Sequence, residues 1–246
     1  MIKKISEISI TVPILDEEEN IKEFYLRLKE VLDKLDKNYE MIFIDDGSKD
    51  SSFEILKELS RKDNRVKVVR FEKNFGQSAA FLAGFHYARG NFIVTMDADL
   101  QCDPAEVNKL VEKIDFGFDA VGAYRKNRCD SRFIRKIPSF FMNKIMNNRT
   151  GIKLKDWGCS FSALSREIAV KISFYGDNAR FIKPLAAKLA TNSTEIEIKH
   201  CERKHGKSRY NLFKLFVNAF DFLINSSAEP SKSNRPLFVV QETLGL

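Results

Sequence analysis

Residues 41–48 read Met-Ile-Phe-Ile-Asp-Asp-Gly-Ser, a short apolar run that ends in two carboxylates and a turn. An apolar run of this length, bounded by turn residues, predicts a strand. The same arrangement recurs at residues 92–99, where the apolar run Phe92–Met96 leads into Asp97-Ala98-Asp99. The sequence thus predicts two strands whose carboxyl ends are acidic.

Segments with helical periodicity alternate with these strands. Upstream, apolar residues alternate over 8–12 and predict a further strand, and residues 21–35 carry the stripe of an amphipathic helix. Downstream, residues 51–59 and 77–88 predict helices on either side of a strand at 66–71. This α/β alternation predicts a Rossmann-like, mainly parallel sheet with helices on both faces.

The strand ends show where a ligand would bind. In sheets of this class, ligands bind at the carboxyl ends of the strands. Those ends are Pro13–Asn20, Asp45–Asp50 and Asp97–Gln101, and all three are acidic or polar. We therefore expect the active site along this edge of the sheet.

Length and charge narrow the functional classes. The chain has 246 residues, 43% hydrophobic and 30% charged, which excludes disordered and collagen-like classes and allows one large domain, with or without an appendage. The net charge of +7 is unevenly distributed, since residues 1–121 carry −6 and residues 122–246 carry +13. The basic half contains no RNA- or DNA-binding motif, so we do not expect nucleic acid as a partner.

The N-terminal sequence, the cysteines and the uncharged stretches indicate the cellular compartment of the protein. The start, Met1–Lys4, leads into charged sequence without the apolar core of a signal peptide. The four cysteines are scattered, which favours reduced thiols, and the longest stretch without formal charge, 75–88, is too polar for a bilayer span. We expect a cytosolic protein.

Two basic amphipathic helices are predicted in the second half, at 133–147 and 212–223. Most such helices pack one face on the core and leave the other solvated. Contact with a membrane surface is the alternative for both.

Asp97 and Asp99 suggest metal chemistry. Two carboxylates two residues apart on an extended chain can reach one hard cation, Mg²⁺ or Mn²⁺, which keeps positions open for substrate phosphates. Helix capping and a solvated loop acid are the structural alternative. Asp46 can accept hydrogen bonds from a base or a ribose, while Ser48 and Asp50 can cap the following helix. The turn at 74–77 opens a helix whose backbone N–H groups could face a polar ligand.

These motifs resemble those of the family 2 glycosyltransferases, and specifically of the branch that acts on polyprenyl phosphates. The likeness covers about residues 6–225. The resemblance rests on five motifs: Val12–Asn20, Ile44–Ser51, Asn74–Ala80, Asp97–Gln101 and Glu202–Tyr210.

The resemblance implies a GT-A fold, a UDP- or GDP-sugar as donor, a polyprenyl phosphate as acceptor, and inversion at the anomeric carbon. The residues it implies for the donor side are Pro13, Glu17 and Asp46 for the nucleoside, and Asp97, Asp99 and Gln101 for the metal and the diphosphate. It implies Arg125, Arg203 and Arg209 as contacts of the donor and acceptor phosphates and Asp156 as part of the acceptor side; with Asp99, these four form the implied catalytic set.

Elementary electrostatics agrees with these roles. A diphosphate leaving group and a phosphate nucleophile bring several negative charges together, and cations hold that assembly. A phosphate monoester is largely anionic at neutral pH, so Asp156 need not act as a base. As structural alternatives, Arg125 pairs with an acid at the core edge, Asp156 is a cap or ion-pair partner, and Arg203 and Arg209 are solvated.

The chain departs from the family pattern at three places. Leu15-Asp16 stands where relatives often have Tyr-Asn, and Arg209 where they usually have Lys. This branch generally continues into two transmembrane helices, whereas here a polar stretch follows residue 225. We expect a catalytic domain at 1–225 (nucleotide and metal half 1–121, acceptor half 122–225) and a tail at 226–246, with a peripheral location on the cytosolic face of the membrane, supported by the basic helices and a homo-oligomer or membrane partner.

Two other functions stay open. The enzyme could transfer the sugar to a soluble glycan or a protein hydroxyl. The chain could also be a truncated, non-catalytic remnant that binds a nucleotide sugar.

Overall fold

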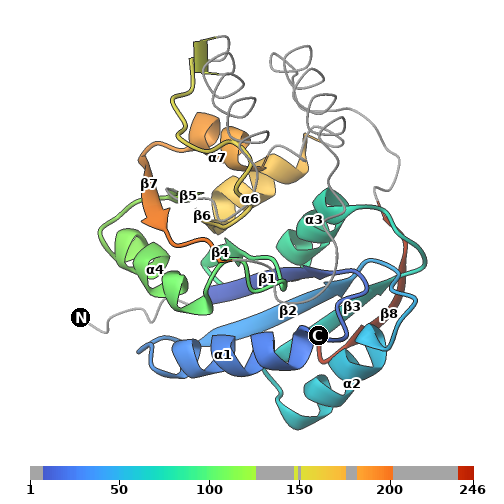
Figure 1. The fold of residues 1–246 in the computed structure, drawn as a ribbon. Helices are drawn as coiled ribbons and strands as arrows, with labels where there is room; N and C mark the ends of the chain where they lie inside the picture. Colours follow the sequence, from blue (N-terminus) through green and yellow to red (C-terminus); the bar gives the residue numbers. More distant parts are fainter. Residues whose placement is uncertain (1–7, 126–146, 149–150, 176–181, 202–237) are drawn as a thin grey trace.

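The structure, a computed structural model, describes residues 8–125, 147–148, 151–175, 182–201 and 238–246. These residues form an eight-stranded sheet in the order β7-β5-β6-β4-β1-β2-β3-β8. Its centre, β4-β1-β2-β3, is parallel. The predicted mainly parallel sheet is therefore present, with antiparallel strands added to it (Figure 1).

The first half follows the predicted alternation. The elements are β1 (Ile8–Ile14), α1 (Ile21–Asp33), β2 (Tyr39–Asp45), α2 (Ser52–Lys62), β3 (Val66–Phe71), α3 (Gln77–Tyr87) and β4 (Phe92–Thr95). Each predicted segment is confirmed in type, and the bounds shift by up to three residues at the ends of elements, where assignments ordinarily vary.

For the second half, the sequence predicted only the two helices at 133–147 and 212–223. This half contains a 3₁₀ turn (Pro104–Glu106), α4 (Val107–Asp115), β5 (Ala120–Arg125), β6 (Ser162–Ser165), α6 (Arg166–Ser173), α7 (Ile182–Leu189), β7 (Ser193–Ile198) and β8 (Val240–Leu244). β6 lies antiparallel between β4 and β5, and β7 pairs parallel with β5. One continuous sheet therefore joins the acidic and basic halves of the chain.

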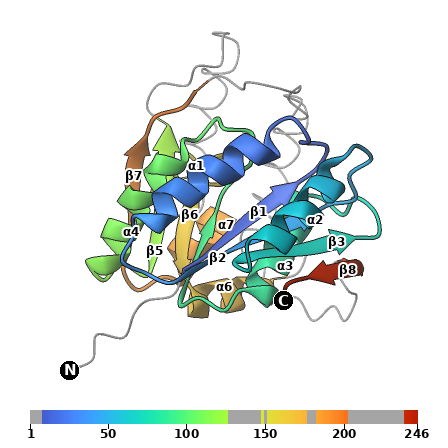
Figure 2. The ribbon, with the colours of Figure 1, turned by 90° about the horizontal axis from the view of Figure 1, so that it is seen from below.

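Helices cover both faces of the sheet. Along β2, Met41 and Phe43 belong to the hydrophobic cluster that includes residues of α1, α2 and α4. Ile42 and Ile44 belong to the cluster that includes residues of α3, α6 and α7. The apolar run at residues 41–44 is continuous because successive side chains point to opposite faces and both faces are buried. Figure 2 shows the two layers of helices in front of and behind the sheet.

The end of the chain corrects one expectation. Residues 226–246 were predicted to be a tail, but Val240–Leu244 pairs antiparallel with β3 as strand β8. Just before β8, the ring of Phe238 stacks on Phe71 with centroids 5.0 Å apart. The strand pairs with the backbone groups along β3 and becomes the edge strand of the sheet.

Other predictions fall on residues that the structure does not describe. These include the helix at 212–223, nearly all of the helix at 133–147, and both Arg203 and Arg209. Across the described ranges, no helix has the length and apolar character needed to cross a membrane.

Candidate active site

Hydrogen bonds join the carboxyl ends of β1 and β2. The Ser48 Oγ accepts from the amide of Asp16 at 3.0 Å, and the Asp16 carboxylate accepts from the amide of Lys49 at 2.7 Å. The Asp50 carboxylate accepts from the amide of Ser52, the first residue of α2, at 2.9 Å. Of the two predicted capping residues, Asp50 therefore holds the start of α2, while Ser48 holds the loop after β1.

Asp46 connects β2 to the start of α3. Its carboxylate accepts from the amide of Phe75 at 2.6 Å and from the amide of Gly76 at 2.9 Å. These N–H groups belong to the turn at 74–77, for which a polar ligand and a plain helix start were both open, and in this structure their partner is Asp46. The two segments approach closely because Gly47 has no Cβ, and its φ of 75° places it in the left-handed region.

A sharp turn presents the second acidic strand end. Leu100, buried in the core, has a φ of 58°, which is uncommon for a residue with a side chain. The Asp99 Oδ1 accepts from the amide of Gln101 at 3.0 Å and stabilises this turn, and the Gln101 carbonyl accepts from the amide of Cys201 at 2.9 Å. Backbone strain of this kind clusters at functional sites.

Both oxygens of Asp97 are held by uncharged donors. Gln77 Nε2 donates to Oδ1 at 2.6 Å, and the Ser160 hydroxyl donates to Oδ2 at 2.6 Å. Burial raises the pKa of Asp97, and the nearby charge of Asp99 raises it further, while the two donors oppose the shift. The carboxylate thus has a fixed orientation and an environment that favours an added positive charge.

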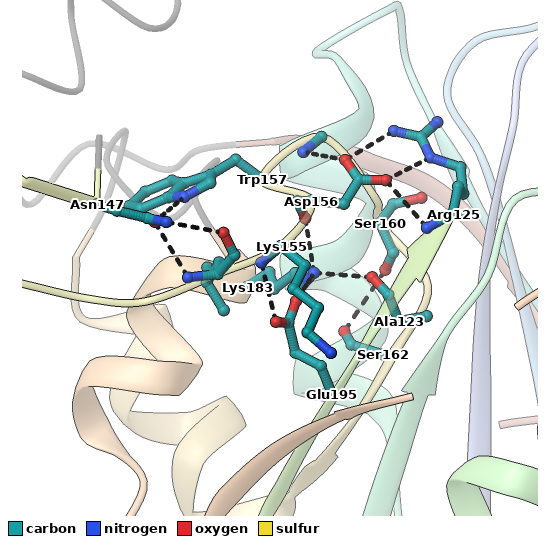
Figure 3. Close-up of polar contacts among 12 residues, drawn as sticks. Ala123, Arg125, Asn147, Lys155, Asp156, Trp157, Ser160, Ser162, Lys183 and Glu195 are labelled. Atoms are coloured by element: carbon teal, nitrogen blue, oxygen red, sulfur yellow. Dashed lines mark hydrogen bonds and ion pairs between the residues drawn. The ribbon is translucent and has the colours of Figure 1, made fainter. Parts of the chain in front are cut away.

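Arg125, at the end of β5, forms a buried ion pair with Asp156. The distances are 2.6 Å from Nε to Oδ2 and 3.0 Å from Nη2 to Oδ1, a bidentate arrangement (Figure 3). Gly158 donates its amide to Oδ1 at 3.1 Å. The two side chains are 12% and 11% exposed. Burial lowers the pKa of Arg125, but the hydrogen bonds and charge of Asp156 outweigh burial and raise it overall. The structural alternative for both residues, an ion pair, is therefore realised.

The residues of the second strand end fit a divalent cation. Asp97 and Asp99 supply carboxylate oxygens, the ligands that hard cations prefer, and their mutual repulsion would be relieved by a bound cation. Within the described ranges, no group of three or more His, Cys, Asp or Glu side chains is gathered as a metal site. One or two carboxylates together with substrate phosphates are the usual protein environment of Mg²⁺.

The structure connects most of the predicted site residues that it describes. A chain of contacts runs from Asp46 through the start of α3 to Asp97, and from Asp97 to Ser160 on the loop that carries Asp156. Pro13, near the carboxyl end of β1, lies opposite Ile44 of β2. Glu17 lies beyond that end, and its carboxylate accepts from the side chain of Asn20 at 2.6 Å.

Sequence reasoning did not assign roles to Gln77 and Ser160. Gln77 falls inside the motif Asn74–Ala80, and Ser160 lies four residues after Asp156. Their role as donors to Asp97 depends on contacts across 20 and 63 residues of sequence, which leave no local signal.

Comparison with known proteins places these observations in a family. The model described as "Glycosyl transferase family 2" matches residues 9–173. The chain is 36% identical over 232 residues to an undecaprenyl-phosphate 4-deoxy-4-formamido-L-arabinose transferase of Edwardsiella ictaluri, covering 94% of this chain and 71% of that protein. A protein of the same name from Aeromonas hydrophila is 37% identical over 92% of this chain and 69% of its own length.

Solved structures show the same fold at low sequence identity. Glucosyl-3-phosphoglycerate synthase from Mycobacterium tuberculosis, in complex with phosphoglyceric acid, superimposes with a TM-score of 0.65 at 18% identity over 92% of this chain and 82% of the other. The complex of that enzyme with Mn²⁺, uridine diphosphate and phosphoglyceric acid gives 0.64 at 19% identity, over 92% and 80%. The predicted GT-A fold is confirmed.

Proposed function

Because the chain belongs to glycosyltransferase family 2, we propose that it is an inverting glycosyltransferase that moves a sugar from a nucleotide-diphosphate donor to a polyprenyl phosphate. The observation that carries this proposal is the joined pair of sites at one sheet edge: the Asp97–Asp99 strand end, and the Arg125–Asp156 pair linked to it through Ser160. The names of the curated relatives supply the acceptor class, an undecaprenyl phosphate.

The proposed donor side follows the strand ends β1, β2 and β4. Pro13, Glu17 and Asp46 contact the nucleoside. Asp97, Asp99 and Gln101 would hold Mg²⁺ or Mn²⁺ and the diphosphate. A cation held there would supply positive charge against the leaving diphosphate. Asp97 is pre-oriented for this role by Gln77 and Ser160.

The proposed acceptor side is basic and needs no strong base. An oxygen of the polyprenyl phosphate attacks the anomeric carbon while the bond from that carbon to the diphosphate oxygen breaks, which releases the nucleoside diphosphate. The attacking oxygen is already anionic at neutral pH, because the second pKa of a phosphate monoester is about 6. Asp156 therefore need not act as a base; with both of its oxygens bound by Arg125, it orients the Arg125 guanidinium. Arg125, Arg203 and Arg209 contact the phosphates.

We further propose that the enzyme works as a peripheral protein on the cytosolic face of the membrane. The lipid nature of the acceptor in the named relatives and the charge of +13 on residues 122–246 support this location. A homo-oligomer or a membrane partner subunit would add further attachment.

The test is a transfer assay with Mn²⁺, a panel of UDP- and GDP-sugars, and undecaprenyl phosphate in detergent. We expect one donor to yield a glycolipid, and Asp99→Asn to lower its formation by at least about 100-fold, as loss of a group that stabilises transition-state charge does. Asp115→Asn, at the exposed end of α4, is the matched control and should retain activity.

Three outcomes would contradict the proposal. Transfer to a saccharide or protein hydroxyl without lipid would favour the second enzymatic function. Unchanged transfer and donor hydrolysis in Asp99→Asn would remove the metal role. Nucleotide-sugar binding without product from any donor would favour a non-catalytic remnant.

A further inference from the structure

Lys183, near the start of α7, is a buried cation close to the Arg125–Asp156 pair. The residue is 5% exposed, although lysine is almost never fully buried unless it is paired. Its Nζ donates to the carbonyl of Ala123 at 2.7 Å and to the carbonyl of Asp156 at 2.6 Å, and it forms an ion pair with Glu195 Oε1 at 2.7 Å. Two hydrogen bonds and one ion pair therefore hold this ammonium group.

Glu195, on β7, binds the loop that carries Lys155 and Asp156, to which Lys183 also binds. Its Oε2 accepts from the amide of Lys155 at 2.9 Å, and Lys183 holds the carbonyl of the next residue, Asp156. Figure 3 shows Lys183 between Glu195 and the backbone of Ala123 and Asp156. The Lys183–Glu195 pair thus fixes two consecutive residues of the loop through their backbone.

These contacts link the two backbones that carry the Arg125–Asp156 side chains. Ala123 lies two residues before Arg125 on β5, so one ammonium bonds both to the strand of Arg125 and to Asp156 itself. The strand also leaves room for the lysine stem: a Cβ at Gly122 would lie 2.5 Å from the Cε of Lys183. A shift of Lys183 would therefore move both partners of the ion pair.

Stability alone is a weak explanation for such an arrangement. Desolvating two charges is expensive, and well-packed apolar residues of similar volume often stabilise a protein equally well or better. An apolar pair, however, would leave the two carbonyls and the Lys155 amide without these partners. The charged pair supplies directional bonds where the loop meets the strand.

We propose that Lys183 and Glu195 are positioning residues that set the geometry of Arg125 and Asp156, and thereby the binding of phosphate groups on the acceptor side. The proposal rests on the proposed function for its catalytic consequence. Neither residue touches the reacting atoms, so both act through the Arg125–Asp156 pair.

The test compares Lys183→Met with the double variant Lys183→Met/Glu195→Gln. The single variant leaves the Glu195 carboxylate buried without its cation, whereas the double variant removes that charge but does not restore the bonds to the two carbonyls. We expect the double variant to recover most of the melting temperature lost by the single variant, yet to keep a kcat/KM for undecaprenyl phosphate at least about tenfold below wild type, since misplaced positioning groups cost about 10–100-fold. Affinity for the Mn²⁺ complexes of UDP and GDP should change less than about twofold, because the donor side lies on other strand ends.

Hydrogen–deuterium exchange supplies a second measurement that does not depend on catalysis. We expect faster exchange of the amides of Arg125 and Gly158 in both variants, with β1 unchanged. Gly122→Ala, which displaces the Lys183 stem without changing charge, should produce the same pattern to a smaller degree. Lys37→Met, which breaks a lysine–aspartate pair of the same 2.7 Å length before β2, is the matched control and should change neither activity nor exchange at these amides.

The outcomes separate the two proposals. Full recovery of transfer together with the melting temperature in the double variant, or exchange that rises equally throughout the sheet, would show that the pair only stabilises the fold. If the wild-type enzyme forms no glycolipid, the proposed function fails, while the local exchange pattern still decides the positioning role. Should the lysine variants not fold, unchanged exchange at Arg125 and Gly158 in Gly122→Ala would overturn the proposal.

Discussion

Replacing Gly47 with alanine should break the junction between β2 and α3 on which the donor side depends. A Cβ at this position would lie 2.6 Å from the carbonyl carbon of Lys73 and 2.8 Å from the amide nitrogen of Asn74, both backbone atoms that cannot rotate away. The φ of 75° adds conformational strain for any residue with a side chain. The substitution therefore has two separable costs.

Gly117 separates them, because its φ of 94° is also positive but no atom lies within 4 Å of its Cβ position. Gly117→Ala should cost only the strain, about 1–2 kcal/mol. Gly47→Ala should cost the strain plus about 1–3 kcal/mol for forcing atoms into a filled space. At about 2–4 °C per kcal/mol for a chain of this size, its melting temperature should fall about 6 °C further than that of Gly117→Ala.

The measurements are urea unfolding, thermal unfolding, and affinity for the Mn²⁺ complexes of UDP and GDP. Affinity should fall in Gly47→Ala but not in Gly117→Ala, since relief of the clash moves the segment whose amides bind Asp46. Equal loss of stability in the two variants, with unchanged nucleotide affinity in both, would refute the steric reasoning and the proposed role of this junction.

Two further predictions concern ion pairs. Asp156→Asn should lower the unfolding free energy measured in urea by about 3 kcal/mol, because Arg125 would stay buried without its anion. Adding Arg125→Met should restore this stability but not sugar transfer. A double variant that still transfers sugar would contradict the phosphate-binding role of Arg125. Burial alone would raise the pKa of Asp63, but hydrogen bonds from Arg65 and Tyr25 hold it below its usual value. The stabilising contribution of the Asp63 carboxylate is therefore full above the unfolded pKa of about 3.9 and is lost as pH falls through the lower folded value. The difference in unfolding free energy between wild type and Asp63→Asn, about 1–3 kcal/mol at pH 7, should shrink below pH 4. A difference that stays constant with pH would disprove the assignment.

The first half of the fold could be predicted because its signals are local. The apolar runs at β2 and β4 alternate with helical segments, of which α1 and α2 are amphipathic, and each run ends in carboxylates. Parallel strands place their carboxyl ends at one edge, so Asp46, Asp97 and Asp99 could be assigned to a common site from spacing alone. The family motifs lie on these same segments.

The second half required the tertiary structure. β6 reads Ser-Ala-Leu-Ser, with no apolar run, and β8 alternates only weakly in burial, so neither carries a strong pattern, and β8 forms because β3 offers an open edge. The partners of Asp97 and the Lys183–Glu195 pair come from segments far apart in the sequence.

Sequence by itself thus determined the sheet class, the family motifs and the edge where the acidic residues gather, since periodicity and strand ends are properties of short segments. Only the tertiary structure decided what each polar side chain binds: Asp46 the amides at the start of α3, Asp97 the donors Gln77 and Ser160, and Arg125 the carboxylate of Asp156. The physical reason is that hydrogen bonds depend on distances of about 3 Å, and such distances between remote segments exist only once the chain has packed.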